Sequence, residues 1–342
     1  MKQRDQAAFY PMTFCPVLKQ YVWGGRNLAL VLGRTLPEGI VAESWEIAAH
    51  KDGDTLADNG RFAGCSLSDI HAELGLDLIG TNNAWAQERD KFPLLVKLLD
   101  ANRPLSVQVH PDDEYALAHE GNELGKSEMW VVLHAEPDAA VILGVKPGTT
   151  PARFRDALKQ GSVDAFVHRI PVHKGDIIHV PSGSVHAILG GVIIAEIQQN
   201  SNTTYRVYDW GRASADRPLH IEKAMDVINF NQVDAHPSRP RLIEEAAWGR
   251  RLALCRNRYF IAERIELKAG EVYFGHCDGS TLEIWGAIEG SGEVNGVSLK
   301  AVRFTLLPAA LGAYTVSVAE DAVFLRTYVP APNSQPRFDV SE

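Results

Sequence analysis

Cysteine is scarce in this chain of 342 residues, and its spacing excludes two kinds of site. The four cysteines, Cys15, Cys65, Cys255 and Cys277, lie far apart, and no Cys-x-x-Cys pair occurs. The sequence therefore indicates neither a zinc site built from thiolates nor a redox-active dithiol. Sparse, unclustered cysteine is typical of a reducing compartment, so we expect a cytoplasmic protein.

Long apolar runs and an excess of positive charge are also missing. The longest apolar stretches, such as residues 190–197, fall far short of the roughly 20 residues that span a bilayer. The first 16 residues contain no apolar segment of the kind found in signal peptides. Asp and Glu outnumber Lys and Arg by 43 to 34, which gives a net charge of −9. We therefore expect neither nucleic acid nor a membrane as a partner.

Glycine-rich phosphate loops and a regular alternation of strands and helices are absent, which disfavours a doubly wound nucleotide-binding fold. Short runs rich in Val and Ile, bounded by turn residues, instead predict strands near 131–133, 139–144, 176–180, 192–197 and 260–267. Helices are predicted at 66–74, 150–160 and 220–228. The second of these has a capping Thr150, Pro151 at its first position and Gly161 after its end.

Two similar halves are indicated by a repeated strand–turn–strand pattern at residues 175–186 and 304–314, of which only the first contains a histidine in the second strand. A polar segment at 231–250, with Pro237 and Pro240, lies between the halves. We predict a mainly β protein with two barrel domains and a few short helices. Residues 1–235 would form the catalytic domain, and residues 236–342 a degenerate domain that has lost its site.

Polar side chains alternate with valine along residues 105–110. Ser106, Gln108 and His110 fall on one face of a strand, and Val107 and Val109 on the other. A strand of this kind is expected where its polar face lines a site.

A second strand and a turn extend this set of polar side chains. Lys126 and Glu128 also alternate onto one face, and His186 follows a Pro-Ser-Gly turn. Two imidazoles, a carboxylate and an amide oxygen, from His110, His186, Glu128 and Gln108, suit a borderline divalent ion. Each residue alone is more simply a core or surface group, so the prediction rests on their combination.

At these residues the chain resembles the type I mannose-6-phosphate isomerases (phosphomannose isomerases), in the short form without a large helical insertion. The motifs that carry the resemblance lie in order at 23–25, 43–50, 92–97, 105–113, 125–130, 180–186 and 205–209, with 306–309 fitting the degenerate half. The resemblance implies a two-domain cupin (jelly-roll) fold with one zinc ion in the N-terminal barrel. It implies the same four metal ligands, Gln108, His110, Glu128 and His186.

The resemblance also implies a reaction and the residues that perform it. Members interconvert mannose 6-phosphate and fructose 6-phosphate, an aldose–ketose isomerisation through a metal-assisted enediol. Arg206 is implied as an essential basic residue at the active site, and Ser106, Lys97 and Lys126 as residues that line the substrate cleft.

The chemistry requires a general base for the proton that moves between C1 and C2. Glu196 is the first candidate, because it precedes Arg206 on the strand that follows His186, although a structural ion pair would explain it equally well. Arg206 could bind phosphate or polarise O1, while Lys97 and Lys126 would offer charge and Ser106 a hydroxyl to the phosphate. Trp23 and Trp45 could form a sugar platform or belong to the core.

Two other functions remain open on the residues alone. A cupin dioxygenase that uses iron or manganese would accept the same ligands, and a sugar-phosphate sensor would keep the pocket without catalysis. We expect a sugar phosphate as the small-molecule partner, and either a monomer or a homodimer.

Overall fold

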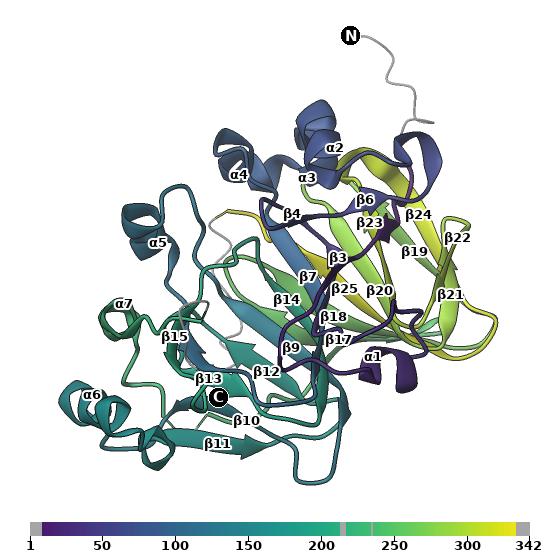
Figure 1. Ribbon diagram of the computed structural model, residues 1–342. Coiled ribbons are helices and arrows are strands. Elements are labelled where there is room, and N and C mark those ends of the chain that lie inside the picture. The colour runs from purple at the N-terminus through teal and green to yellow at the C-terminus, as the bar shows by residue number, and fades with distance from the viewer. Residues whose placement is uncertain (1–8, 213–216, 234, 333–342) are drawn as a thin grey trace. The chain divides into compact units, whose positions relative to one another are not determined.

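The structure is a computed structural model, and it describes residues 9–212, 217–233 and 235–332 (Figure 1). Antiparallel strands dominate it, and the chain divides into two compact units. The unit that we call the site unit contains residues 18–44 and 97–238; the companion unit contains residues 9–17, 45–96 and 239–332. Within the described part of the chain, no helix has both the length and the apolar character needed to cross a membrane.

The site unit is a sandwich of two sheets. The first has the order β12 (Ile177–Val180), β9 (Glu128–Ala135), β14 (Val192–Gln199), β7 (Leu94–Ala101), β3 (Glu43–Ile47) and β2 (Val17–Lys19), of which the last three continue into residues of the companion unit. The second has the order β11 (Val167–Pro171), β10 (Ala140–Val145), β13 (His186–Ile188), β8 (Val107–Val109) and β15 (Tyr205–Tyr208). Apolar side chains of both sheets share one core, which includes Trp130 of β9 and Val141 of β10.

Helices cover the other face of the five-stranded sheet. Val107 and Val109 of β8 pack in a second core with Phe154 of α6 (Pro151–Gln160) and Ala224 of α7 (Ile221–Val227). Because successive side chains of a strand point to opposite faces, the polar residues that alternate with these valines are directed into the sandwich. Two further helices, α1 (Asn27–Leu30) and α5 (Asp113–His119), also belong to the site unit.

The companion unit repeats the two-sheet arrangement. One sheet has the order β16 (Arg241–Ala246), β17 (Gly249–Arg256), β18 (Ile261–Leu267), β25 (Ala322–Tyr328), β20 (Glu283–Glu289) and β23 (Arg303–Leu307). The other has the order β19 (Val272–Cys277), β24 (Gly312–Ser317), β21 (Ser291–Val294) and β22 (Val297–Lys300). Smaller elements are the strand pairs β1 (Phe14–Cys15) with β6 (Leu56–Ala57) and β4 (Ala49–His50) with β5 (Gly53–Asp54), and the helices α2 (Leu67–Leu74), α3 (Leu76–Ile79) and α4 (Ala84–Glu88).

Local sequence signals explain where several elements begin and end. Helix α6 begins at Pro151, the hydroxyl of Thr150 accepts a hydrogen bond from the N–H of Arg153, and Gly161 ends the helix in the left-handed region. Asn295 and Gly296 both have positive φ in the tight turn between β21 and β22, as a two-residue hairpin requires. The three predicted helices are confirmed as α2, α6 and α7.

The predicted fold class is confirmed, with a mainly β chain, two sandwiches of jelly-roll type and short helices. The sheets stay open at their edges rather than closing into barrels. The predicted domain boundary at 235/236 stays a prediction. The chain passes for the last time from the site unit to the companion unit at 238/239, and residues 45–96 also belong to the companion unit.

Candidate active site

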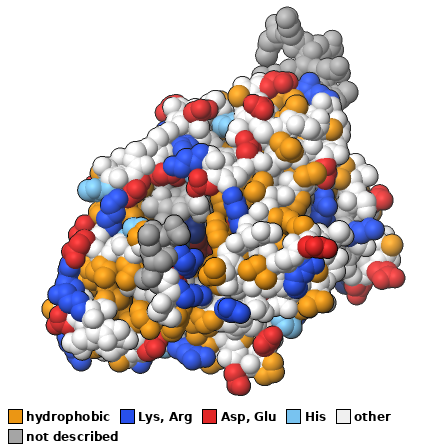
Figure 2. Space-filling view, viewed as in Figure 1, with side chains coloured by type: hydrophobic (Ala, Val, Ile, Leu, Met, Phe, Trp, Pro, Cys, Tyr) orange, Lys and Arg blue, Asp and Glu red, His pale blue; other side chains and the backbone are white. Residues whose placement is uncertain are grey.

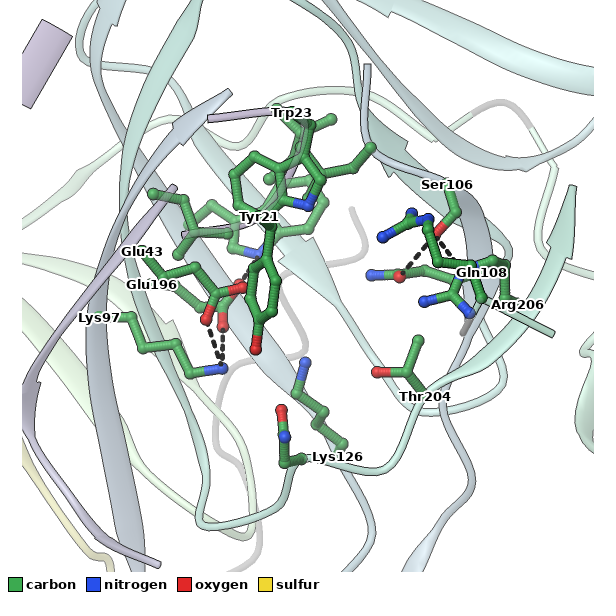
Figure 3. A pocket seen from close by; sticks show the side chains of 16 residues that line it. Tyr21, Trp23, Glu43, Lys97, Ser106, Gln108, Lys126, Glu196, Thr204 and Arg206 are labelled. Carbon is green, nitrogen blue, oxygen red and sulfur yellow. Dashed lines mark hydrogen bonds and ion pairs between the residues drawn. The ribbon is translucent and has the colours of Figure 1, made fainter. Parts of the chain in front are cut away.

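A cavity of about 290 Å³ opens in the site unit, and every residue that lines it comes from that unit (Figure 3). Cavities of a few hundred Å³ accommodate small molecules. Glu43, Lys97 and Glu196 gather at one side of the cavity, and Ser106, Gln108, Thr204 and Arg206 at the other. The cavity therefore has an end rich in carboxylates and an end with an arginine.

Three buried side chains converge beside this cavity. One ligand atom from each of His110, Glu128 and His186 lies within 4.8 Å of the others. Nε2 of His110 is 3.2 Å from Oε1 of Glu128, and Nε2 of His186 is 4.0 Å from Oε2 of the same carboxylate. These three of the four predicted ligands are therefore brought together from β9, β13 and the end of β8.

Backbone carbonyls orient both imidazoles. Nδ1 of His110 is 2.8 Å from the carbonyl oxygen of Thr203, and Nδ1 of His186 is 3.0 Å from that of Ser184. A carbonyl only accepts, so each Nδ1 carries the proton and each Nε2 keeps a lone pair that is directed into the site. Burial lowers the pKa of both histidines, and with the nearby Lys126 ammonium it lowers the pKa of His110 to about 3. Both rings are therefore neutral, which is the form that binds a metal.

Gln108 and Lys126 complete the group around Glu128. Nε2 of Gln108 lies 3.2 Å from Nε2 of His186, and rotation of the amide would present its oxygen there instead. The Lys126 ammonium contacts Oε1 of Glu128 and lies 3.2 Å from Nε2 of His110. Burial raises the pKa of Glu128, but the adjacent Lys126 ammonium outweighs this effect and holds that pKa well below its usual value. The Lys126 ammonium shows that a positive charge is accommodated at this point. The donor set of one ionised carboxylate, two neutral imidazoles and one amide fits a divalent metal ion.

Glu196 is buried next to this group, on β14. The indole N–H of Trp130 donates to Oε2 of Glu196 at 3.1 Å and to Oε2 of Glu128 at 3.0 Å, so one side chain links the two carboxylates. Nζ of Lys97 is 3.8 Å from Glu196 and 3.7 Å from Glu43. Burial and the Glu128 charge raise the pKa of Glu196 to about 7. A carboxylate of that pKa can both accept and release a proton near neutral pH.

Arg206 lies at the other end of the cavity, on β15 beside β8. Its Nε donates to the hydroxyl of Ser106 at 3.3 Å, and its Nη1 to the carbonyl of Pro218 at 3.0 Å. The structure thus distinguishes two kinds of cationic side chain that the sequence alone could not distinguish. Lys97 and Lys126 lie with carboxylates, whereas Arg206 lies with neutral partners.

Sequence reasoning missed several residues that line the cavity, namely Tyr21, Trp130, Asn202, Thr204 and Arg217. Trp130 could have been found, because it continues the alternation of Lys126 and Glu128 along β9. The two tryptophans proposed for a sugar platform differ in position. Trp23 lines the cavity, whereas Trp45 packs in a small core of the companion unit with Ala48 and Leu95.

The companion unit contains a related arrangement of charges. Glu283 and Trp285 of β20 repeat the Glu-x-Trp pattern of Glu128 and Trp130, and again the indole N–H donates to the carboxylate, at 2.9 Å. Arg326 pairs with Trp285 across the strands as Glu196 pairs with Trp130. Its guanidinium donates to Glu283 at 2.6 and 2.8 Å and to Glu263 at 3.1 Å. In the companion unit, an arginine therefore neutralises the carboxylate that corresponds to Glu128.

Comparison with known proteins gives consistent matches. Residues 12–135 match the family model for the phosphomannose isomerase type I catalytic domain. The chain is 42% identical over 242 residues to mannose-6-phosphate isomerase ManA of Bacillus subtilis, covering 69% of this chain and 73% of that protein. It is 35% identical to the "Probable mannose-6-phosphate isomerase GmuF" of the same organism, over 90% of this chain and 96% of the relative.

A solved structure matches as well. The crystal structure of the mannose 6-phosphate isomerase from Bacillus subtilis superposes with a TM-score of 0.83 at 29% identity, over 93% of this chain and 99% of that one. A structure from Archaeoglobus fulgidus, at 22% identity and a TM-score of 0.73, supports the fold alone.

Proposed function

The chain belongs to the type I phosphomannose isomerases and is an aldose–ketose isomerase, and we propose that it interconverts mannose 6-phosphate and fructose 6-phosphate in the cavity of the site unit. The observation that carries this proposal is the placement of a buried carboxylate with a pKa near 7, Glu196, beside a donor set for a metal and in the same cavity as Arg206. Proton transfer between C1 and C2 of the sugar requires a base and positive charge beside it in one cavity.

Gln108, His110, Glu128 and His186 would hold the metal, and zinc is the ion that this mixture of imidazole and carboxylate suits best. When bound, the ion supplies positive charge that stabilises the negative charge developing on the sugar oxygens. The hydrogen bonds from each Nδ1 to a backbone carbonyl support this assignment, because they direct both Nε2 lone pairs to one point.

Glu196 is the general base in this proposal. In its ionised form it removes the proton from one carbon of the substrate, and the resulting acid returns a proton to the neighbouring carbon. The Trp130 indole holds one carboxylate oxygen and thereby leaves the other directed toward Lys97 and the cavity. Burial excludes bulk water from the carboxylate, which protects the enediol from side reactions.

The remaining predicted residues would bind and orient the substrate. Arg206 would contact the phosphate or O1, with Ser106 holding the guanidinium in place. Lys97 and Lys126 would contact oxygens of the substrate from the end rich in carboxylates. On the face shown in Figure 2, Lys and Arg side chains lie among Asp and Glu side chains rather than in one basic patch, so the cationic groups that matter for an anionic substrate are those of the cavity.

A cytoplasmic location is also part of the proposal. All four cysteines are free thiols, and two of them, Cys15 and Cys65, are exposed. Exposed free thiols persist in a reducing compartment.

A coupled assay tests the proposed function. Mannose 6-phosphate and glucose 6-phosphate are presented separately, fructose 6-phosphate is followed with excess coupling enzyme, and the metal content is measured on the same sample. We expect turnover of mannose 6-phosphate that follows the zinc content. Turnover of glucose 6-phosphate alone, or full activity in protein depleted of metal, would contradict the proposal.

A further inference from the structure

Two arginines hold a single buried carboxylate next to Arg206. The side chain of Asp209 has no exposed surface, and Arg217 binds both of its oxygens, at 2.7 and 3.0 Å. Arg212 donates to the same carboxylate at 2.9 Å. Asp209 is thus more than neutralised by its own partners.

Arg217 and Arg206 are held side by side by the backbone. The carbonyl of Pro218, the residue after Arg217, accepts from the guanidinium of Arg206 at 3.0 Å. The N–H of His220 donates to the carbonyl of Arg206 at 2.7 Å, so residues 218–220 run along β15 at this point. Burial lowers the pKa of Arg206, and the charge of Arg217 lowers it further, which reflects the proximity of the two cations. Both arginines line the cavity, whereas Arg212 points to the carbonyl of Pro104.

The charges at the two ends of the cavity differ. Lys97 lies near Glu43 and Glu196, and Lys126 contacts Glu128, so both lysines are already compensated by carboxylates. At the other end, by contrast, Arg206 and Arg217 bring two positive charges to the cavity, and Arg212, which does not line it, pairs with Asp209 behind them. A phosphate monoester carries about −1.5 to −2 charges at neutral pH. The arginine end is therefore the end at which such a group is electrostatically favoured.

We propose that Arg217 contacts the phosphate of the substrate together with Arg206, and that Asp209 is the positioning residue that presents the Arg217 guanidinium to the cavity. The inference rests on the proposed function, because it takes a sugar phosphate as the substrate. A carboxylate behind an arginine fixes the planar fork of the guanidinium, so little conformational entropy is lost when an anion binds. The sugar then extends from this end, with its C1 and C2 toward Glu196.

Steady-state kinetics of Arg217→Met tests the inference. Loss of a charge-assisted contact weakens binding by about 10- to 100-fold, so KM for mannose 6-phosphate should rise by that factor while kcat stays within about threefold. KM for fructose 6-phosphate should rise by the same factor, because both sugars present the same phosphate. Arg217→Lys should give an intermediate KM, and Asp209→Asn a smaller rise in the same direction.

Arg212→Met is the matched control, since it removes an equal charge from the same carboxylate without removing a cavity-lining side chain. Its KM should change by less than about threefold. A KM for Arg217→Met within twofold of the wild type, a loss confined to kcat, or an equal effect of Arg212→Met would each overturn the inference. Wild-type enzyme that fails to convert mannose 6-phosphate would instead overturn the proposed function. Should Asp209→Asn fail to fold, the Arg217 variants alone decide the outcome.

Discussion

Replacement of Glu196 by glutamine tests the assignment of the general base most directly. Gln keeps the shape of the side chain and an oxygen that can accept from the Trp130 indole. Lys97 keeps Glu43 as a partner at 3.7 Å, so the substitution leaves no lysine isolated in the core. The variant should therefore fold and should retain the group of metal ligands, but the amide cannot accept the substrate proton.

The expected loss follows from the role of a positioned base. General bases contribute about 10² to 10⁴ in rate, which corresponds to about 3 to 5 kcal/mol of activation free energy. The coupled assay should show kcat lower by that factor with normal metal content. In D₂O, incorporation of deuterium at C1 and C2, followed by NMR, should be lost to the same extent.

The pH profile gives a second readout of the same variant. Burial and the charge of Glu128 raise the pKa of Glu196 to about 7, and only the ionised form is a base, so activity of the wild type should fall as the pH drops below about 7. A divalent ion bound at Glu128 would add positive charge, lower the pKa of Glu196 and so move this fall in activity to lower pH. The residual activity of Glu196→Gln should not show this fall at low pH.

Glu43→Gln is the matched control, because it removes a carboxylate from the same end of the cavity and from the same lysine. Its kcat should change by less than about fivefold. Glu196 would not be the general base if Glu196→Gln retained more than a tenth of the activity, or if Glu43→Gln lost as much activity as Glu196→Gln.

Three further outcomes are expected. His110→Ala and Glu128→Ala should lose bound metal and activity together, as measured by elemental analysis and the coupled assay; retention of both would contradict the ligand assignment. Arg206→Ala should keep its metal but lose turnover, and unchanged turnover would exclude a role in catalysis. Arg326→Met should lower the unfolding free energy in urea by about 3–5 kcal/mol, because it leaves the Glu283 carboxylate buried without its cation; a change below 1 kcal/mol would show that the ion pair stabilises little.

Periodicity carried most of what could be predicted from the sequence. The alternation of Ser106, Gln108 and His110 with Val107 and Val109 predicted two opposite faces of one strand, and the valine face is the one that α6 and α7 cover. Caps and turn residues fixed the ends of α6 in the same local way. Signals of this kind depend on neighbours in the chain, so one sequence is sufficient to find them.

The charge partners could not be predicted in this way. Lys97, Lys126 and Arg206 are all cations near the predicted site, and spacing along the chain does not distinguish them. Their roles separate only when the fold places Glu43 and Glu196 beside Lys97, and Ser106 beside Arg206. Asp209 was part of a recognised motif, but its contact with Arg217 depends on the path of the chain after β15.

Arg326 has a consequence for how the two units respond to their surroundings. A guanidinium attached to the chain neutralises Glu283 at any solution composition, because its effective concentration is set by the covalent structure. The metal ion proposed at Glu128 is dissociable, so it would obey mass action and would stabilise the site unit only in proportion to the logarithm of its free concentration. Removal of the metal should therefore lower the resistance of the site unit to proteolysis and leave that of the companion unit unchanged.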